Sequence, residues 1–374
     1  MMRMNFYRTI SFTIAILLQA ILISCKDLQH KIEQPLPAQG TGAKSVAVIK
    51  PLYVTDTVPS DTDDPAIWIN QQDPGKSLVI GTDKNERGGL YVFDLKGKMD
   101  TTRSVRGLNR PNNVDIEYGF KLGGGMIDIA VATERYTHKL RIYSLPGMQP
   151  VDDGGIPVFV GETQPGYREL MGIALYKNRH GQVYAIVGRK TGPTDGSYLW
   201  QYLLEDDGKG HIKATLMRKF GKYSGKHEIE SIAVDDELGY VYYSDEGTGV
   251  RKYYAGTENG NSELALFADT GFAGDHEGIS IYKTSDSTGF ILVSDQQANQ
   301  FHIFRREGDP LEPHRHKLLR VVKVSANESD GSETVSIGLN KDFPKGIFVA
   351  MSDNKTFHFY RAETILGDSL LTKK

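Results

Sequence analysis

Short apolar runs separated by polar turns recur along the chain and predict a β protein built from a repeated hairpin. In each repeat, an apolar strand is followed by a turn and then by a second strand rich in aromatic and β-branched residues, which favour strands. The six predicted pairs are Leu78–Ile80 with Leu90–Phe93, Ile127–Ala132 with Leu140–Tyr143, Val183–Val187 with Tyr198–Tyr202, Tyr240–Tyr243 with Val250–Tyr254, Phe290–Val293 with Phe301–Phe304, and Gly346–Ala350 with Phe357–Tyr360. A spacing of roughly 50 residues is typical of propeller blades.

A shorter strand rich in small residues precedes each hairpin, as suits the innermost strand of a blade beside a crowded central channel. These inner strands are predicted at Pro65–Trp68, Val114–Glu117, Gly172–Leu175, Ser231–Val234, Gly278–Ile281 and Val335–Gly338. Outer fourth strands are predicted at Ile156–Val160, Ala214–Phe220 and Leu318–Val324. We therefore expect an all-β fold, a six-bladed β-propeller. The alternative is a two-sheet sandwich, which six equal units disfavour.

The first residues have the pattern of an export signal. Arg3 and Arg8 accompany an apolar run, Ile10–Ile23, that is shorter than a typical membrane span. The run ends in Leu-Ile-Ser-Cys25, which resembles a bacterial lipobox, so lipidation of Cys25 is expected. The alternative is an ordinary signal peptide with a chance cysteine.

The expected organisation is a lipoprotein signal peptide at residues 1–24, a flexible tether at 25–44 and the propeller at 45–374. The protein would then be exported as an outer-membrane or cell-surface lipoprotein, or otherwise be periplasmic or secreted. We expect contact with the membrane only through the lipid anchor, and a monomer.

Composition narrows the possible chemistry. Cys25 is the only cysteine, so intramolecular disulfides and thiolate zinc sites are excluded. The net charge of -3 lacks the basic excess usual in nucleic-acid-binding proteins, so no nucleic-acid partner is expected.

Acidic residues recur at one end of the predicted inner strands. The residues just before these strands are Asp64, Asn113, Met171, Glu230, Glu277 and Thr334, and a propeller places equivalent positions in a ring around one mouth of its channel. Asp63, Glu228, Asp275 and Asp330 lie within a few residues of that ring. The following strands run back to the same mouth and end in Asp83-Lys84, Glu134-Arg135, Arg189-Lys190, Asp245-Glu246 and Asp295-Gln296.

Carboxylates packed this closely repel one another unless they share protons or hold cations. Oxygen ligands without cysteine favour a hard cation such as Ca²⁺, which tolerates irregular ligand sets. The cationic side chains expected at the same mouth are Lys84, Arg87, Arg135 and Lys190. Calcium ions and basic groups together make a surface for a polyanion that carries several phosphates. Asp235-Asp236-Glu237, in contrast, has the pattern of a solvated turn.

Six motifs, in order, resemble the calcium-dependent β-propeller phytase family over the chain from about Ser45 to the C-terminus. They are Asp63-Asp64-Pro65-Ala66-Ile67-Trp68, Gly81-Thr82-Asp83-Lys84 with Gly88-Gly89-Leu90, Asn112-Asn113-Val114-Asp115, Glu230 leading into Asp235-Asp236-Glu237, Asp275-His276-Glu277-Gly278, and Ser329-Asp330-Gly331. The resemblance implies hydrolysis of the phosphomonoesters of phytate (myo-inositol hexakisphosphate), of the 3-phytase type, which releases phosphate and lower inositol phosphates.

The resemblance also implies residue roles. The implied ligands of several Ca²⁺ ions are Asp63, Asp64, Glu230, Glu246, Asp275, Glu277, Gln296 and Asp330. Glu230, Lys84 and Arg135 are implied to be catalytic. The implied phosphate-binding residues are Lys84, Arg87, Arg135 and Lys190. Met171 departs from the family pattern, which has a phosphate-contacting tyrosine there. The remaining alternatives are a calcium-dependent propeller lactonase and a non-catalytic propeller that binds other molecules at the cell surface.

Overall fold

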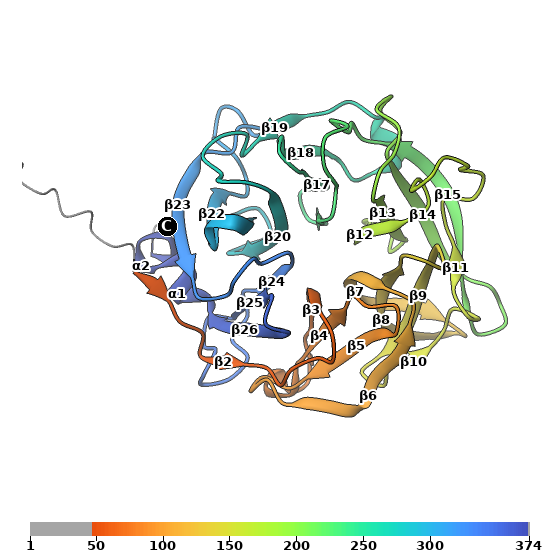
Figure 1. The fold of residues 1–374 in the computed structure, drawn as a ribbon, viewed down its shortest axis with the longest axis horizontal. Coiled ribbons are helices and arrows are strands. Elements are labelled where there is room, and N and C mark those ends of the chain that lie inside the picture. Colours follow the sequence, from red (N-terminus) through yellow and green to blue (C-terminus); the bar gives the residue numbers. More distant parts are fainter. Residues whose placement is uncertain (1–46, 373–374) are drawn as a thin grey trace, which may run out of the picture. The chain divides into compact units, whose positions relative to one another are not determined.

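Six β-sheets surround a central channel in the computed structural model, which describes residues 47–372 (Figure 1). Each sheet is one blade, and its innermost strand lines the channel. The predicted six-bladed β-propeller is therefore confirmed. Residues 1–46, which hold the predicted signal peptide, Cys25 and the tether, lie outside the described part of the chain. Within the described part, no helix is long and apolar enough to span a membrane.

The first three blades run from the channel outward in chain order. Their strands are β3 (Thr62–Trp68), β4 (Leu78–Asp83), β5 (Gly88–Phe93) and β6 (Met99–Leu108); then β7 (Pro111–Leu122), β8 (Gly125–Glu134), β9 (Lys139–Leu145), β10 (Gln149–Pro150) and β11 (Ile156–Pro157); then β12 (Leu170–Lys177), β13 (Val183–Arg189), β14 (Leu199–Asp206) and β15 (Ile212–Phe220).

The last three blades use strands from both ends of the described chain. Their strands are β16 (Ile232–Asp235), β17 (Tyr240–Asp245), β18 (Gly249–Tyr254) and β19 (Ala265–Phe267); then β20 (His276–Lys283), β21 (Gly289–Asp295), β22 (Gln300–Arg305), β23 (Leu318–Val324) and β1 (Val48–Ile49); then β24 (Ser332–Val335), β25 (Ile347–Ser352), β26 (Thr356–Arg361) and β2 (Tyr53–Val54). Two short helices, α1 (Ala362–Leu366) and α2 (Asp368–Leu371), follow β26.

The ring closes because the first two strands of the described chain join the sheets of the last two blades. Strand β2 pairs antiparallel with β26, with Tyr53 opposite Phe359, and so supplies the outer strand of the sixth blade. Strand β1 adds in parallel to β23 of the fifth blade. The last blades therefore cannot complete their sheets without the first residues of the propeller, which makes closure a cooperative event.

Apolar side chains hold neighbouring blades together. One buried cluster, for example, joins Ile129 and Ile142 of the second blade to Ile173 and Val187 of the third. Each such side chain contributes roughly 1.5–3 kcal/mol through burial. The interior is therefore distributed among the blade interfaces, and the channel is left free to carry polar groups.

Two predicted strands differ from the structure. The inner strand of the sixth blade is Ser332–Val335 and not Val335–Gly338, so Asp330, rather than Thr334, lies at its channel mouth. A hydrogen bond from Gly278 N to Asp330 O (2.6 Å) holds this register against the fifth blade. The predicted outer strand at Ile156–Val160 is reduced to the two residues of β11.

The predicted turn at Asp235-Asp236-Glu237 is present at residues 236–239, where Glu237 is exposed, but Asp235 is buried and not solvated. Asp235 and Arg306 are fully buried and form a two-pronged ion pair, Nε to Oδ2 and Nη2 to Oδ1, each 2.6 Å. Glu237 accepts a further bond from Arg306 Nη2 at 3.0 Å. Asp236 accepts a hydrogen bond from Lys177 N and lines the channel. The acidic run therefore joins the fourth blade to the fifth and third, through partners distant in sequence.

Asp235→Asn should destabilise the protein by about 3–5 kcal/mol, because it removes the buried counter-charge of the Arg306 guanidinium and leaves only the more exposed Glu237. The measurement is the free energy of unfolding in urea. The matched control is Asp286→Asn in an exposed turn, which should change that free energy by less than about 0.5 kcal/mol. Equal urea midpoints for the two variants would contradict a structural role for the pair.

Candidate active site at one mouth of the channel

Irregular pairing recurs where the inner strands reach one mouth of the channel. In four blades the register between inner and second strand shifts, at Thr62/Pro65, Pro111/Val114, Leu170/Ile173 and His276/Ile279. Such bulges put extra residues opposite the partner strand and change the direction of their side chains. The residues inside these shifts include Asp63, Asn112, Met171 and Glu277. The local irregularity therefore falls on two predicted metal ligands, Asp63 and Glu277, and on the equivalent positions of two other blades.

In the residue pairs that end the second strands of the first five blades, the two residues have different roles. The first residue of each pair is buried and binds backbone of the loop that enters the mouth. Asp83 accepts a hydrogen bond from Asp61 N (2.7 Å), and Asp245 accepts one from Ser224 N (2.9 Å). The equivalent bonds are Asn109 N to Glu134 (2.7 Å), Ala273 N to Asp295 (3.1 Å) and Arg189 Nη1 to Tyr167 O (3.2 Å).

The second residue of each pair carries the candidate chemistry. These residues are Lys84, Arg135, Lys190, Glu246 and Gln296. Their positions are fixed because the neighbouring buried residues hold the surrounding loops and strand ends through hydrogen bonds. Arg189, the first residue of its pair, is fully buried and stacks on aromatic rings, so its role is structural.

Carboxylates from different blades meet around Asn112. Asn112 Nδ2 donates hydrogen bonds to Asp63 Oδ2 and to Glu230 Oε1, each at 3.0 Å. Lys84 Nζ forms an ion pair with Asp63 Oδ1 at 3.0 Å and another with Asp330. Gln296 donates from Nε2 to the same Asp330 side chain. The first, second, fourth, fifth and sixth blades are thus linked through one polar network.

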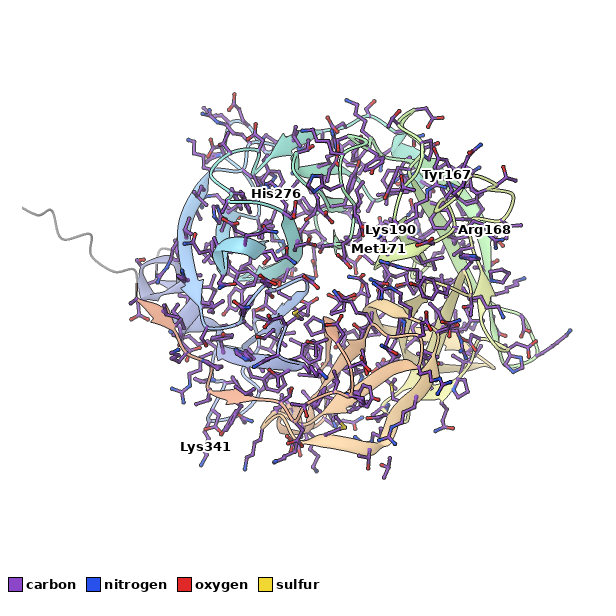
Figure 2. All side chains as sticks on the ribbon, viewed as in Figure 1. Tyr167, Arg168, Met171, Lys190, His276 and Lys341 are labelled. Atoms are coloured by element: carbon purple, nitrogen blue, oxygen red, sulfur yellow. The ribbon has the colours of Figure 1, made fainter. Side chains whose placement is uncertain are left out.

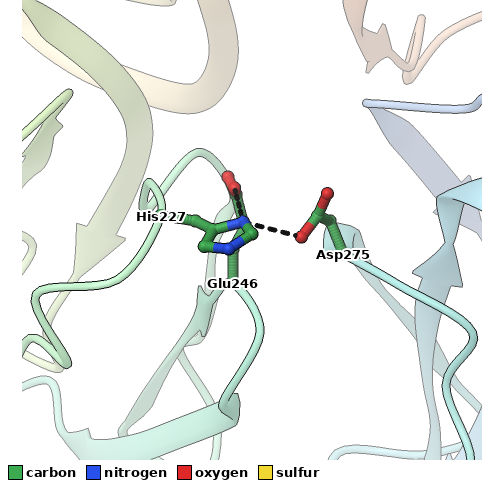
Figure 3. Close-up of side chains that lie close together, drawn as sticks. All are labelled: His227, Glu246 and Asp275. Atoms are coloured by element: carbon green, nitrogen blue, oxygen red, sulfur yellow. Dashed lines mark ion pairs between the residues drawn. The ribbon is translucent and has the colours of Figure 1, made fainter.

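A second part of the network is almost purely acidic. Oxygens of Glu230, Glu246 and Glu277 all lie within 4.8 Å of one another. Glu277 is 4% exposed, and its Oε2 has no hydrogen-bond partner within residues 47–372. Glu246 also belongs to a neighbouring group with His227 and Asp275 (Figure 3). We call these five residues and Asp63 the carboxylate cluster, in which His227 is the one nitrogen-bearing member.

Burial and mutual repulsion raise the pKa values of four carboxyl groups in the carboxylate cluster. Burial, only partly offset by Lys84, raises the pKa of Asp63 to about 7. Burial likewise raises the pKa of Glu246 to about 8. The pKa values of Glu230 and Glu277 lie well above their usual range, first through burial and then through neighbouring carboxylates. At neutral pH the cluster must therefore hold protons or cations.

The donor set fits a hard divalent cation. The cluster offers buried carboxylate oxygens, an unpaired Oε2 on Glu277 and an unpaired Oδ1 on Asn112. Calcium takes six to eight oxygen ligands of this kind in irregular geometry. The residues that can supply oxygens to such ions are Asp63, Glu230, Glu246, Asp275, Glu277, Gln296 and Asp330.

The predicted cationic side chains differ in how free they are. Lys84 is held between Asp63 and Asp330, and its side chain is largely buried. Arg135 is buried, donates from Nε to Leu170 O (3.2 Å) and contacts Met171 Sδ. Lys190 is 43% exposed and pairs with Glu228 Oε1 at 2.5 Å. In Figure 2, Lys190 and Met171 are both labelled toward the centre of the ring.

Two predicted site residues lie apart from the carboxylate cluster. Asp64 lines the channel, where its Oδ2 accepts a hydrogen bond from Val114 N at 3.1 Å. Arg87 lies on an exposed turn, and its side chain makes no hydrogen bond or ion pair within residues 47–372. Both remain predictions as ligand and phosphate contact, respectively.

Asn112, His227 and Glu228 are site residues without a role predicted from the sequence. Asn112 was visible as part of a motif, but its two carboxylate partners are distant in sequence. His227 and Glu228 stand three and two residues before Glu230, respectively, and that proximity was the available signal.

An acidic and basic mouth on a six-bladed propeller defines a class of protein suited to metal ions and phosphorylated substrates. Comparison with known proteins identifies the family. The Phytase family matches residues 20–359. A 3-phytase from Bacillus subtilis (strain 168) is 32% identical over 308 residues, covering 79% of this chain and 76% of the relative.

The chain belongs to the β-propeller phytase family and is a phytase enzyme. This excludes the lactonase and the non-catalytic binding propeller as its primary class. The match to a solved structure, described as the Dos1 propeller, covers 80% of this chain and 67% of the Dos1 chain, with a TM-score of 0.42 and 11% sequence identity. That likeness is too low to bear on fold or function.

The raised pKa values predict how metal-free stability depends on pH. Between about pH 4 and pH 8, the folded protein keeps protons on Asp63 and Glu246 that the unfolded chain has released. The free energy of unfolding should therefore fall as pH rises through this range. Thermal unfolding of chelator-treated protein should show a lower Tm at pH 8 than at pH 5.

Glu230→Gln should raise the metal-free Tm at pH 8, because it removes one of the repelling charges. Glu205→Gln, on an exposed position of β14, should leave the pH profile unchanged. A metal-free protein equally stable at pH 5 and pH 8 would contradict the assigned charge repulsion.

Proposed function

We propose that this phytase hydrolyses the phosphomonoester bonds of phytate in a calcium-dependent reaction of the 3-phytase type, releasing inorganic phosphate and lower inositol phosphates. The observation that carries the proposal is the grouping of Glu230, Glu246 and Glu277, with an unpartnered buried oxygen, beside the cation Lys84. Buried anions alone would repel phytate. With several Ca²⁺ ions held among them, the same surface attracts it.

Bound calcium would supply charge for the phosphate oxygens and would lower the pKa of water. The chain's own contribution is to hold its ligands rigidly. Asn112 fixes the facing oxygens of Asp63 and Glu230, and Gln296 fixes Asp330. This preorganisation matters because phosphoryl transfer depends chiefly on positioning and electrostatic stabilisation.

Lys84 and Arg135 are proposed to stabilise the transferring phosphoryl group. Lys84 already lies against two carboxylates that would also face the ions, so its ammonium group is aimed at the same point. Arg135 donates a hydrogen bond to the carbonyl of Leu170 and contacts Met171 Sδ, and these two contacts orient its guanidinium. A planar guanidinium can bind two phosphate oxygens at once.

Lys190 is proposed to bind a second phosphate of the substrate. Its ammonium pairs with Glu228, and both side chains are partly exposed, so exchange of that partner for phosphate costs little. Arg87, on its exposed turn, is proposed as an outer phosphate contact. The proposed occupant of the mouth is phytate or another inositol polyphosphate, and the proposed acting form is a monomer.

The N-terminal sequence supports a proposal about location. We place the enzyme outside the cytoplasm, attached by a lipid on Cys25 at the outer membrane or cell surface. A polyanionic substrate does not cross membranes readily, so an exported enzyme would meet it directly.

Glu230→Gln should lower phosphate release from phytate by about two orders of magnitude or more, because it removes a charge from the proposed calcium site while keeping the side-chain volume. The measurement is phosphate release with calcium and with chelator, alongside circular dichroism to confirm folding. Glu205→Gln serves as the control. Full calcium-dependent activity in Glu230→Gln would remove Glu230 from the proposed mechanism.

Cys25→Ser should release the protein from the membrane fraction without changing its specific activity, because residues 47–372 contain the whole candidate site. Fractionation followed by a detergent-free wash checks this. Retention of the variant in the washed membranes would count against the lipid anchor.

A further inference from the structure

We propose that His227 gives the carboxylate cluster a subsite for a borderline divalent cation, such as Zn²⁺ or Co²⁺, beside its all-oxygen part. The inference deepens the proposed function, since Glu246 belongs to both parts. It concerns which metal ion is preferred at the position formed by His227, Glu246 and Asp275, which we call the outer position.

Three separate elements bring the ligands together (Figure 3). His227 comes from the loop before β16, Glu246 follows β17, and Asp275 precedes β20. His227 Nδ1 lies 3.0 Å from Asp275 Oδ1 and 4.0 Å from Glu246 Oε2. All three ligand atoms lie within 4.8 Å of one another. Tetrahedral bonds of about 2.0–2.1 Å set ligand atoms about 3.3 Å apart, and the two observed separations bracket that value.

An unpartnered buried oxygen indicates that the neighbouring position also requires a cation. Glu277 Oε2 has no hydrogen-bond partner in the described part of the chain, and Glu277 belongs to the group that shares Glu246. Glu246 therefore stands between two ligand sets and can serve both. The inner set, with Glu230 and Glu277, contains only carboxylates, whereas the outer set contains an imidazole.

The imidazole is available for this role. Its ring is bounded by the two carboxylates, and the side chain is 55% exposed, so its orientation can adjust. Within residues 47–372, its recorded polar partners are only Asp275 and Glu246. Imidazole nitrogen suits zinc and cobalt, whereas calcium strongly prefers oxygen. The two positions should therefore differ in metal preference.

The test uses purified full-length protein treated with chelator and titrated with Co²⁺, whose visible d–d absorption reports its ligands. We expect a protein-dependent band that Zn²⁺ displaces and that Ca²⁺ displaces poorly. His227→Gln should weaken Co²⁺ binding by roughly tenfold or more, since even residues that only support a ligand cost that much. Glu246→Gln should also weaken the band.

His211→Gln is the matched control, because His211 is a partly exposed histidine with one carboxylate, Asp207, at 3.9 Å. It should bind Co²⁺ like the unaltered protein. Metal-free Tm values of all variants verify folding, which matters for His227→Gln because one of the two carboxylates that His227 faces, Glu246, is buried.

Phytate hydrolysis with Ca²⁺, measured on the same samples, separates the two proposals. A Co²⁺ band that depends on His227 supports the subsite even if phytate is not hydrolysed. Unchanged Co²⁺ and Zn²⁺ affinity in His227→Gln would overturn the inference, even in a protein with full calcium-dependent activity.

Discussion

Repulsion among buried carboxylates at the channel mouth is the constraint on which the rest of the site depends. Glu230, Glu246 and Glu277 are placed where water cannot screen them, and their pKa values rise in consequence. Left alone, such groups would move apart or take up protons. The fold has to hold them together, so that cations, rather than rearrangement, relieve the repulsion.

The six-bladed ring holds these carboxylates together through a hydrogen-bond arrangement that repeats from blade to blade. At the end of each second strand from the first to the fifth blade, one buried polar residue binds the backbone of an incoming loop, and its neighbour faces the mouth. Two hydroxyl groups also bond to the backbone of the following blade. Thr133 donates a hydrogen bond to Met171 O, and Ser244 donates one to Glu277 O, each at 2.7 Å. Close packing completes the ring, since a Cβ on Gly172 would lie 2.1 Å from Glu230 O. Stability and function thus use the same contacts.

Local pattern was enough to predict the blades and most of the mouth. The hairpin period gave the number of blades, and strand polarity placed Lys84, Glu246 and Gln296 at the same end as Glu230 and Glu277. What failed depended on partners far away in the chain. Asp235 was expected to be solvated because its partner, Arg306, lies 71 positions later. The sixth inner strand was misplaced because its register is held by the neighbouring blade, and His227 was overlooked because Asp275 reaches it from another blade.

The account's central claim is that cations replace protons on the carboxylate cluster. Calorimetric titration of chelator-treated protein with Ca²⁺ at pH 7, in two buffers of different ionisation enthalpy, tests it directly. The account predicts different heats in the two buffers, corresponding to a net release of protons, because Asp63 and Glu246 carry protons near that pH. Equal heats in both buffers, or no calcium binding, would contradict it.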